Sequence, residues 1–434
     1  MNFLRHIVLK KTHHLGIHFG WVMVMLTFTY TFFASAALGV LSILIPSITT
    51  ELQWRIGDLS SPIGVRLVLF GAIAPFAGSL MLRFGYLAIV KLSGALLMLG
   101  LLMVILMTAK WQTWLGLGFL LGIASGLTAM QLASNIAANW FAKKQGFVIG
   151  IINGAIAAGA LVFIPASALI NEYFGWRIAL SIPAIGALLS WTLILLIGCN
   201  KPSDIHLHPY GGANVAKDVE APDASFIQRT ISSLKIGAGN SVFWTLTVVF
   251  AISGATTFGL SQAHLIPILI EQNVSITWAA WLLVVIGVFD LLGSLLSGYL
   301  SDRWNKRILL IVYFVLRAMM LLWLATQQLD KSQMIVFAVL FGLVFMATIP
   351  PVAQLLVSTF GKDVGTILFG WLVAAHHLSA GLATVVLGEY RDHLGNYGNS
   401  LHAISFMCFI AAAFVIAMKD PQSKSHGTGH TSRD

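Results

Sequence analysis

Residues 278–327 read WAAWLLVVIGVFDLLGSLLSGYLSDRWNKRILLIVYFVLRAMMLLWLATQ, two apolar runs that flank a short polar turn. Each run is long enough to cross about 30 Å of hydrocarbon as a helix. Asp290 lies ten residues before Leu300, and Arg317 lies ten residues after Arg307. At about 1.5 Å per residue, both charges therefore lie roughly 15 Å from the same membrane face. Because an unpaired charge is costly there, we expect the two to meet, and charges placed so deep usually mark a functional site.

The whole chain has the composition of a protein whose solvent is lipid. Of its 434 residues, 58% are hydrophobic and only 9% are charged, whereas about a quarter of the residues of a soluble domain are charged. Its mean hydropathy is +0.86. Apolar runs long enough to cross a bilayer predict an all-α membrane protein with twelve transmembrane helices, at residues 18–45, 62–82, 86–108, 112–139, 146–171, 177–198, 241–270, 278–300, 308–327, 333–359, 364–389 and 399–418.

The basic residues sort by loop, which predicts how the chain is oriented. If the N-terminus lies in the cytoplasm, 18 of the 25 lysines and arginines fall in cytoplasmic segments. This asymmetry follows the positive-inside rule. We therefore expect a multi-pass protein of a bacterial inner membrane, with both termini in the cytoplasm. The net charge of +9 then reflects topology, and no nucleic-acid partner is predicted.

A polar segment divides the twelve predicted spans into six and six. Residues 201–223 collect three prolines and two glycines with mixed charges, which is typical of a linker. The predicted domains are a first six-helix bundle at residues 1–198, a cytoplasmic linker at 199–240, a second bundle at 241–420 and a disordered cytoplasmic tail at 421–434. Two pseudo-symmetric bundles of this kind enclose a central cavity and open alternately to each side of the membrane.

A repeated motif supports the division. Gly78-Ser-Leu80-Met-Leu82-Arg83-Phe84-Gly85 follows the second span, and Gly298-Tyr-Leu300-Ser-Asp302-Arg303-Trp304-Asn305-Lys306-Arg307 follows the eighth. In these motifs the chain resembles the major facilitator superfamily, whose loops at both places carry a G-x-L-x-D-R-x-G-R-R type pattern. The resemblance implies a gating role for Gly78, Arg83, Gly298, Asp302, Arg303 and Arg307. Leu82 replaces the acidic residue of the first motif.

Five shorter segments occur in a consistent order along the chain: Phe19-Gly20-Trp21, Leu52-Gln53-Trp54, Asn139-Trp140-Phe141-Ala-Lys143-Lys144-Gln145-Gly146, Phe174-Gly175-Trp176-Arg177 and Asp392-His-Leu-Gly395-Asn-Tyr397. In these segments the chain resembles the branch that includes monocarboxylate carriers and bacterial oxalate/formate exchangers. Two features depart from the animal carriers. The first span lacks their lysine, and Ser294 stands where they have arginine, one turn after Asp290.

Polar side chains at helical spacing mark candidate substrate-binding faces on three spans. Residues three or four apart share a helix face, and the resemblance implies that spans 1, 4, 7 and 10 line the cavity. The alternative is that these side chains bond their own backbone or a neighbouring helix. The candidates are Tyr30 and Thr31 in span 1, Gln131 and Asn135 in span 4, and Thr257 and His264 in span 7.

Further features lie near mid-depth. His376 in span 11 could bind an anion or carry a proton, or could only bridge helices; His377 beside it points about 100° away. Arg66 near the outer end of span 2 either snorkels to the interface, which we favour, or draws anions inward. Pro350 and Pro351 must bend span 10, while Gly146, Gly150 and Gly154 in span 5 predict a ridge for close helix packing.

The charged pair suggests a mechanism. A substrate carboxylate could compete for Arg317, whose planar fork suits a carboxylate, and Asp290, having lost its cation, would take up a proton. Arg317 and His376 are thus candidate substrate ligands, and Asp290 and His376 candidate proton carriers. The alternative is that Arg317 is only a buried structural partner of Asp290.

The sequence predicts a carrier rather than an enzyme. It contains no G-x-x-x-x-G-K-[ST] and no H-E-x-x-H motif, and no cofactor or metal is expected. The hypothesis is a monomeric, proton-coupled secondary transporter of a small organic anion resembling a monocarboxylate, with protons and the lipid bilayer as its other partners. The alternatives are a proton-driven exporter of drugs or amphipathic metabolites and a transporter-like receptor, which the lack of a signalling module in the linker disfavours.

Overall fold

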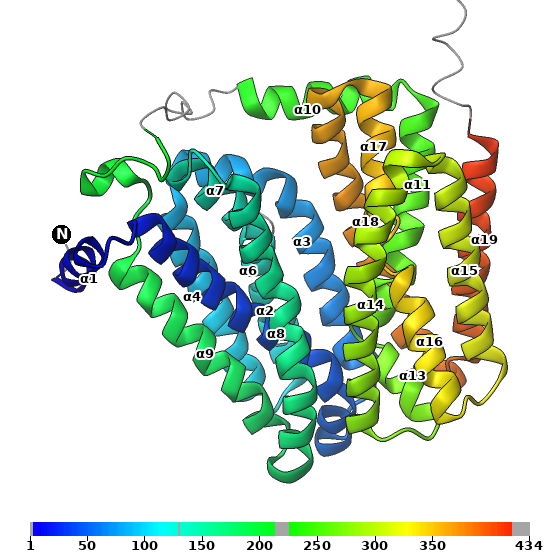
Figure 1. Cartoon of the computed structure of the whole chain (residues 1–434). Coiled ribbons are helices and arrows are strands. Elements are labelled where there is room, and N and C mark those ends of the chain that lie inside the picture. Colours follow the sequence, from blue (N-terminus) through cyan, green and yellow to red (C-terminus); the bar gives the residue numbers. More distant parts are fainter. Residues whose placement is uncertain (1–2, 129–130, 213–224, 419–434) are drawn as a thin grey trace, which may run out of the picture.

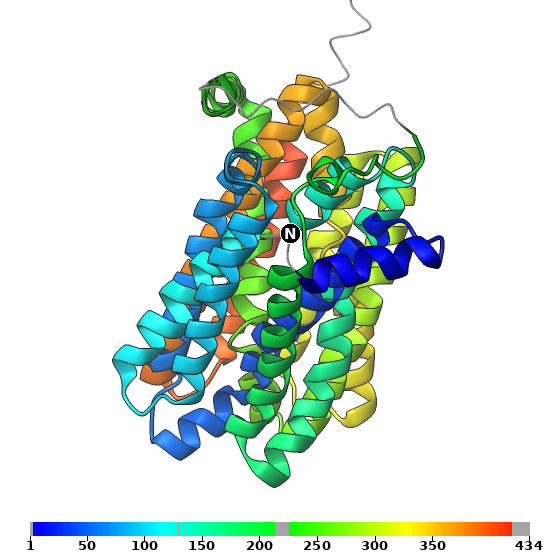
Figure 2. The ribbon, with the colours of Figure 1, turned by 90° about the vertical axis from the view of Figure 1, so that its left-hand side faces the viewer.

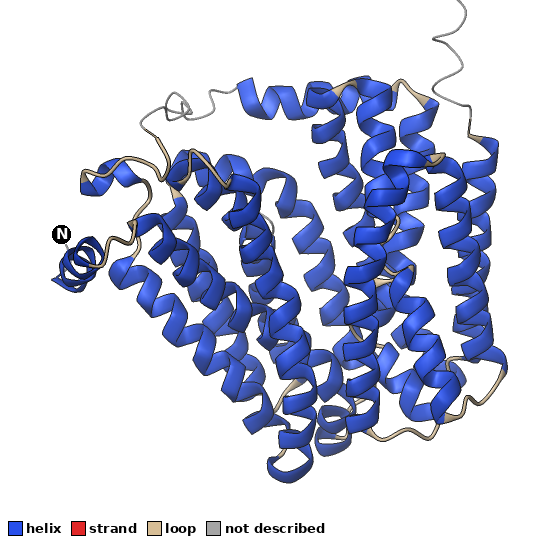
Figure 3. Ribbon diagram, viewed as in Figure 1, coloured by secondary structure: helices blue, strands red, loops and turns tan. Residues whose placement is uncertain are grey.

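The computed structural model describes residues 3–128, 131–212 and 225–418, and it is helical almost throughout (Figure 3). The first half contains α1 (Phe3–His14), α2 (Phe19–Leu52), α3 (Gly57–Phe84), α4 (Tyr86–Ile105), α5 (Lys110–Gln112), the π-helix η1 (Thr113–Leu120), α6 (Leu121–Thr128), α7 (Gln131–Trp140), α8 (Gln145–Phe174) and α9 (Trp176–Ile197). The linker contains the short η2 (Pro202–Ile205) and α10 (Ser225–Ala238). The second half contains α11 (Ser241–Thr256), α12 (Phe258–Ser261), α13 (Leu265–Glu271), α14 (Ile276–Arg303), α15 (Lys306–Thr326), α16 (Lys331–Leu343), α17 (Ile349–Phe360), α18 (Lys362–Leu394) and α19 (Gly398–Ala417).

The twelve predicted spans correspond to twelve helical crossings in two bundles (Figure 1). In the described part of the chain, eleven helical segments are long and apolar enough to cross a membrane. The tenth crossing consists of two shorter apolar helices, α16 and α17. The all-α, two-bundle prediction is confirmed. The predicted tail at residues 421–434 lies outside the described residues.

One face of the molecule carries the linker, and we call it the linker side; the opposite face is the far side. Helix α1 lies across the long axes of the bundle helices (Figure 2). Arg5 of α1 donates to the carbonyls of Ile197 and Gly198 at the C-terminal end of α9, at 3.0 and 2.6 Å. Cations are favoured at this end of a helix, where carbonyl groups lack intrahelical partners. This contact fixes α1 on the first bundle.

The two bundles repeat one ion-pair arrangement on the far side. In the first bundle, Glu51 at the end of α2 pairs with Arg177 at the start of α9. In the second, Glu271 at the end of α13 pairs with Arg391 near the end of α18 at 2.7 Å. Each pair joins the end of the first crossing of its bundle to the segment that leads into the sixth. The equivalent placement supports the pseudo-symmetry of the halves.

The bundles meet along α3 and α18, which run antiparallel. Glycines allow this close approach. A Cβ atom on Gly64 would lie 2.5 Å from the carbonyl oxygen of Gly381, and one on Gly381 would lie 2.4 Å from that of Gly64. Real Cβ contacts are not that short, so the two backbones can touch only because both residues lack side chains.

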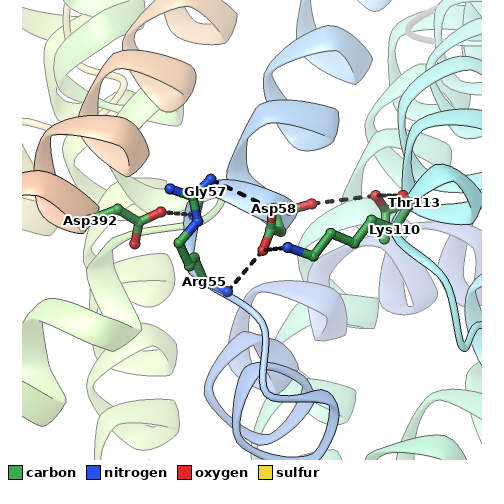
Figure 4. A network of polar contacts seen from close by, with 6 residues as sticks. All are labelled: Arg55, Gly57, Asp58, Lys110, Thr113 and Asp392. Atoms are coloured by element: carbon green, nitrogen blue, oxygen red, sulfur yellow. Dashed lines mark hydrogen bonds and ion pairs between the residues drawn. The ribbon is translucent and has the colours of Figure 1, made fainter.

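Three hydrogen bonds between described residues join the bundles, and all three lie in the far half. The Gly57 amide donates to Asp392 at 2.8 Å (Figure 4). The other two bonds are Arg66 to Gln262, at 2.6 Å, and Thr277 to Glu172, at 3.1 Å. The described inter-bundle bonds therefore close the far side in this state.

The N-terminus of α3 is held by an ion pair of its own (Figure 4). The Asp58 carboxylate lies 2.7 Å from the Lys110 ammonium and accepts from the backbone amide of Arg55 at 2.9 Å. A carboxylate in the first turn complements the positive end of the helix dipole. Asp58 thus secures the helix on which the inter-bundle contact depends.

Candidate functional site

The tenth crossing is broken where Pro350 and Pro351 remove backbone donors. Proline lacks the N–H that would bond the carbonyl four residues earlier, so Pro351 leaves the carbonyl of Ala347 without its helical donor. The Ser297 hydroxyl of α14 donates to that carbonyl at 2.5 Å. The backbone amide of Ile349 donates to the carbonyl of Met346, three residues earlier, at 3.0 Å, and not to that of Phe345, four residues earlier. The predicted bend is thus a full break between α16 and α17.

Arg317 fills the break from one side. Its side chain is fully buried, at 0% exposure. One terminal nitrogen donates to the carbonyls of Val344 and Phe345 at 2.5 and 2.7 Å, which the break has freed. The other donates to the hydroxyls of Ser253 and Thr256 of α11, both at 3.1 Å. Arg317 therefore joins three crossings inside the second bundle.

Asp290 holds the same break from the other side. Its carboxylate accepts from the backbone amide of Met346 at 2.9 Å and from Ser294 at 3.4 Å, and its side chain is only partly buried. The expected direct contact with Arg317 is not formed. Sequence spacing gave the right depth for both charges, but each is satisfied by the backbone between them. Competition of a substrate with Asp290 for Arg317 therefore lacks the contact it would need.

The predicted polar face of span 1 is turned largely toward the inside of its bundle. Tyr30 belongs to the buried core, and the Thr27 hydroxyl contacts the phenol oxygen of Tyr86 in α4 at 2.8 Å. The hydroxyl oxygen of Thr31 is buried without a hydrogen-bond partner. Thr31 thus keeps an unused polar group here.

The candidates in spans 4 and 7 are placed differently. Asn135 is partly exposed and accepts from the amide of Asn139 at 3.2 Å. The side chain of Gln131 lies outside the described part of the structure. Thr257 is buried and donates to the carbonyl of Ser253 at 2.7 Å. Asn135 therefore retains donors for a ligand, whereas Thr257 serves the end of α11.

His264 is fully buried and both of its ring nitrogens are occupied. One lies 2.8 Å from the carbonyl oxygen of Thr384, and the other lies 2.9 Å from the hydroxyl of Tyr397. Burial raises the pKa of the Tyr397 phenol, which therefore stays protonated and donates. This geometry joins the far ends of three crossings and leaves no nitrogen of His264 for a substrate.

The two histidines of α18 differ as their angular separation predicts. His376 is buried, with one ring nitrogen 3.1 Å from the carbonyl of Phe250 in α11. His377 is partly exposed, and its ring stacks at 4.3 Å on Phe70 of α3 and at 5.6 Å on Phe258 of α12. His377, not the expected His376, lies between the bundles.

Arg66 is buried at 6% exposure, so the expected snorkelling to the interface is wrong. Its guanidinium donates to the side-chain oxygen of Gln262, between α12 and α13, at 2.6 Å. The position of Arg66 was visible in the sequence, but its partner was not. Glycines recur every seven residues on α3, at Gly57, Gly64 and Gly71, and this spacing could have shown which face of α3 meets the other bundle.

The sequence matches the family described as Major Facilitator Superfamily over residues 27–384 and, in a second match, 263–430. The chain belongs to the major facilitator superfamily. Its fold is similar to that of the xylose transporter XylE from E. coli in a partially occluded inward open conformation, with a TM-score of 0.66 at 16% identity over 92% of this chain and 99% of that one.

Two curated relatives in this superfamily are monocarboxylate transporters. Monocarboxylate transporter 11 of Mus musculus is 24% identical over 297 residues, 68% of this chain. The chain spans only 62% of that relative's length. Monocarboxylate transporter 13 of Rattus norvegicus is 25% identical over 405 residues, 92% of this chain and 87% of the relative. The predicted resemblance to the monocarboxylate branch of the superfamily is confirmed.

The second superfamily loop motif connects crossings of the second bundle. Asp302 accepts from the amide of Gln354 in α17 at 2.8 Å. Arg307 donates to the carbonyl of Ile416 near the end of α19 at 3.1 Å. The guanidinium of Arg303 lies 3.7 Å from the ring centre of Tyr299. The motif thus joins the linker-side ends of crossings 8, 10 and 12.

The other motif positions make fewer contacts. A Cβ on Gly298 would meet nothing within 4 Å. In the first motif, Arg83 is exposed and lies 5.4 Å from the ring centre of Phe84, while the surroundings of Gly78 lie outside the described part of the structure. A gating role for these residues stays a prediction.

Proposed function

We propose that this multi-pass membrane protein is a secondary active transporter of a small, monocarboxylate-like organic anion, coupled to protons and working by alternating access. The observation that carries the proposal is the partly exposed Asp290 carboxylate bonded to the backbone of the broken tenth crossing. The monocarboxylate transporters among the relatives support the substrate class. The inter-bundle bonds between described residues, all of them in the far half, support alternating access.

The proposed setting follows the sequence. The protein acts as a monomer in a bacterial inner membrane, with both termini in the cytoplasm, and the bundles of residues 1–198 and 241–420 move as units around the linker at 199–240. The basic residues gathered in the linker-side segments support this orientation. In this orientation the state with a closed far side opens to the cytoplasm.

Proton coupling follows from the chemistry of Asp290. A charge-assisted hydrogen bond is roughly twice as strong as a neutral one, so protonation of Asp290 weakens its bond to the Met346 amide and frees the junction of α16 and α17. Moving an anion inward against the membrane potential costs about 2.3 kcal/mol per 100 mV, which one accompanying proton cancels.

The test is uptake by proteoliposomes under an imposed pH gradient. Asp290→Asn keeps an acceptor oxygen for Met346 but cannot take up a proton. We expect gradient-driven accumulation of the transported acid to fall by about tenfold or more, while counterflow exchange, which needs no net proton movement, persists. Asp330→Asn, which changes an exposed carboxylate before α16, is the matched control. Undiminished accumulation in Asp290→Asn would remove Asp290 from the mechanism.

A second candidate is proton-driven efflux of drugs or amphipathic metabolites. The rings of Phe70 and Phe258 on either side of His377 favour it, because they offer an aromatic surface between the bundles. Growth of a deletion strain on single organic acids, set against its drug-susceptibility profile, separates the two functions. A phenotype confined to drug susceptibility would favour efflux.

A further inference from the structure

Arg66 is a buried cation that has no anionic partner in the described part of the chain. Among the described residues, its only hydrogen-bond partner is the neutral side chain of Gln262, and its Nε atom is buried with no partner. Among the residues that the structure describes, no acidic side chain forms an ion pair with Arg66. A buried charge is normally paired, because desolvation of an unpaired ion is costly. The described part of the protein therefore supplies no counter-ion for this guanidinium.

Arg66 lies too far along α3 for its guanidinium to reach the aqueous interface. Arg66 lies nine residues after Gly57, the first residue of α3, so it is about 14 Å along the helix. Gln262 belongs to the seventh crossing in the other bundle. The contact therefore lies between the two bundles, in the half of the protein where the inter-bundle bonds are formed.

A second layer of side chains lies one helical turn from this contact. Phe70 follows Arg66 by four residues on α3, and Phe258 precedes Gln262 by four on the seventh crossing. The His377 ring stacks between the two phenylalanines. Both layers are thus built by both bundles, and Phe70, Phe258, Gln262 and His377 are partly exposed.

We infer that Arg66 and Gln262 form an anion site between the bundles that binds the carboxylate of the transported substrate. This inference rests on the proposed function and assigns its substrate contact. The planar guanidinium donates two parallel N–H bonds to a carboxylate, and the Gln262 amide, whose nitrogen has no described partner, donates a third. The rings of Phe70 and Phe258 pack against the apolar body of the acid.

His377 supplies the remaining polar group of the site. Its Nδ1 lies 2.9 Å from the carbonyl oxygen of Val373, so Nδ1 carries the hydrogen and Nε2 is left as an acceptor. Nε2 has no hydrogen-bond partner among the described residues. It can accept from a hydroxyl group of the substrate, which favours hydroxylated over plain short-chain acids.

A purely mechanical role for Arg66 makes a different prediction. If the bond to Gln262 only held the far side closed, its loss would change the transport of charged and neutral ligands alike. An anion site discriminates between a carboxylic acid and its amide, because the two differ in charge but hardly in shape. The acid–amide comparison therefore separates ligand binding from gating.

The experiment measures binding of benzoate and lactate, and of the neutral benzamide and lactamide, to purified protein. In wild type we expect each acid to bind more tightly than its amide. Arg66→Gln should weaken acid binding by about 10- to 100-fold, the value of one or two charge-assisted hydrogen bonds, and leave amide binding within about twofold. Arg55→Gln, which changes an exposed arginine on the same side, is the matched control and should change neither.

Each of the other outcomes contradicts a specific part of the proposal. Unchanged acid binding by folded Arg66→Gln, with proton-driven acid uptake intact, rejects the site and keeps the proposed function. Equal losses for acid and amide reduce Arg66 to a gate. A wild-type protein that neither binds nor transports either acid removes the proposed function and the site with it. If Arg66→Gln does not fold, Arg66→Lys retains the charge but not the planar fork, and acid affinity that does not fall by about threefold or more rejects the site.

Discussion

Arg317 and Arg66 are both arginines buried in the membrane-spanning part of the protein, yet their surroundings differ. Arg317 makes four hydrogen bonds within one bundle, and its carbonyl partners are groups that the broken tenth crossing has freed. Arg66 makes one bond to a described residue, and that bond crosses between the two bundles. Both arginines have a buried Nε without a partner, but each terminal nitrogen of Arg317 makes two bonds inside one bundle, so Arg317 supports the fold. The guanidinium of Arg66 has fewer bonds and lies at the interface between the bundles, where it is available to a ligand.

The largest expected effect concerns stability: replacing each arginine with a neutral residue should change the free energy of unfolding by different amounts. Arg317→Met leaves the buried carbonyls of Val344 and Phe345 without a donor, so we expect a loss of about 3–5 kcal/mol in the free energy of unfolding. Arg66→Met removes a buried charge that no anion compensates, and its effect should lie within about 1 kcal/mol of zero. Denaturation in detergent micelles measures both. Equal losses would contradict the distinction between the two arginines.

The glycine contact between α3 and α18 provides the next test, since Arg66 can bond Gln262 only while those helices touch. In Gly381→Val, a Cβ would meet the backbone of Gly64 at 2.4 Å, and the helices must separate. Overpacking of this kind costs about 1–3 kcal/mol, enough to shift the population away from the far-side-closed state by about 5- to 150-fold. Distances between spin labels on the far-side ends of α3 and α18 report the shift.

Gly150→Val is the matched control, because a Cβ there would meet nothing within 4 Å. It places the same side chain on a transmembrane helix of the first bundle, away from the contact between α3 and α18. If both variants keep the wild-type distance distribution, the glycine contact does not limit closure.

These glycines also show what the sequence could and could not reveal. Hydropathy predicted every crossing, because each must be long and apolar enough for the bilayer. The small residues of α8 predicted a packing ridge, but Gly150 and Gly154 face open space, and Gly159 makes the close contact instead, with a would-be Cβ 2.3 Å from the carbonyl of Phe32. Spacing identifies a face that could pack closely, but the partner depends on the tertiary arrangement.

The charged residues follow the same rule. The rise per residue placed Asp290 and Arg317 at the same depth. Their shared contact with the tenth crossing agrees with that placement. Depth does not specify direction around the helix axis, so the predicted ion pair is replaced by two sets of bonds to the backbone. Pro350 and Pro351 were visible in the sequence. What could not be read was that Ser297 would bind the carbonyl released by Pro351, and that Arg317 would bind two further carbonyls at the break.

The smallest effect tests this account of the break directly. Ser297→Ala should cost about 1–2 kcal/mol, because it leaves the Ala347 carbonyl buried without a donor. In a Pro351→Ala background, residue 351 regains an N–H that can bond that carbonyl, and the cost of Ser297→Ala should fall below about 0.5 kcal/mol. The resulting coupling of about 1 kcal/mol is within reach of a double-mutant cycle. Pro350→Ala is the control, since its restored donor is aimed at Met346, whose carbonyl already accepts from Ile349. The cost of Ser297→Ala should therefore be unchanged in the Pro350→Ala background. If that cost is the same in wild type, Pro351→Ala and Pro350→Ala, proline does not free the carbonyl that Ser297 binds.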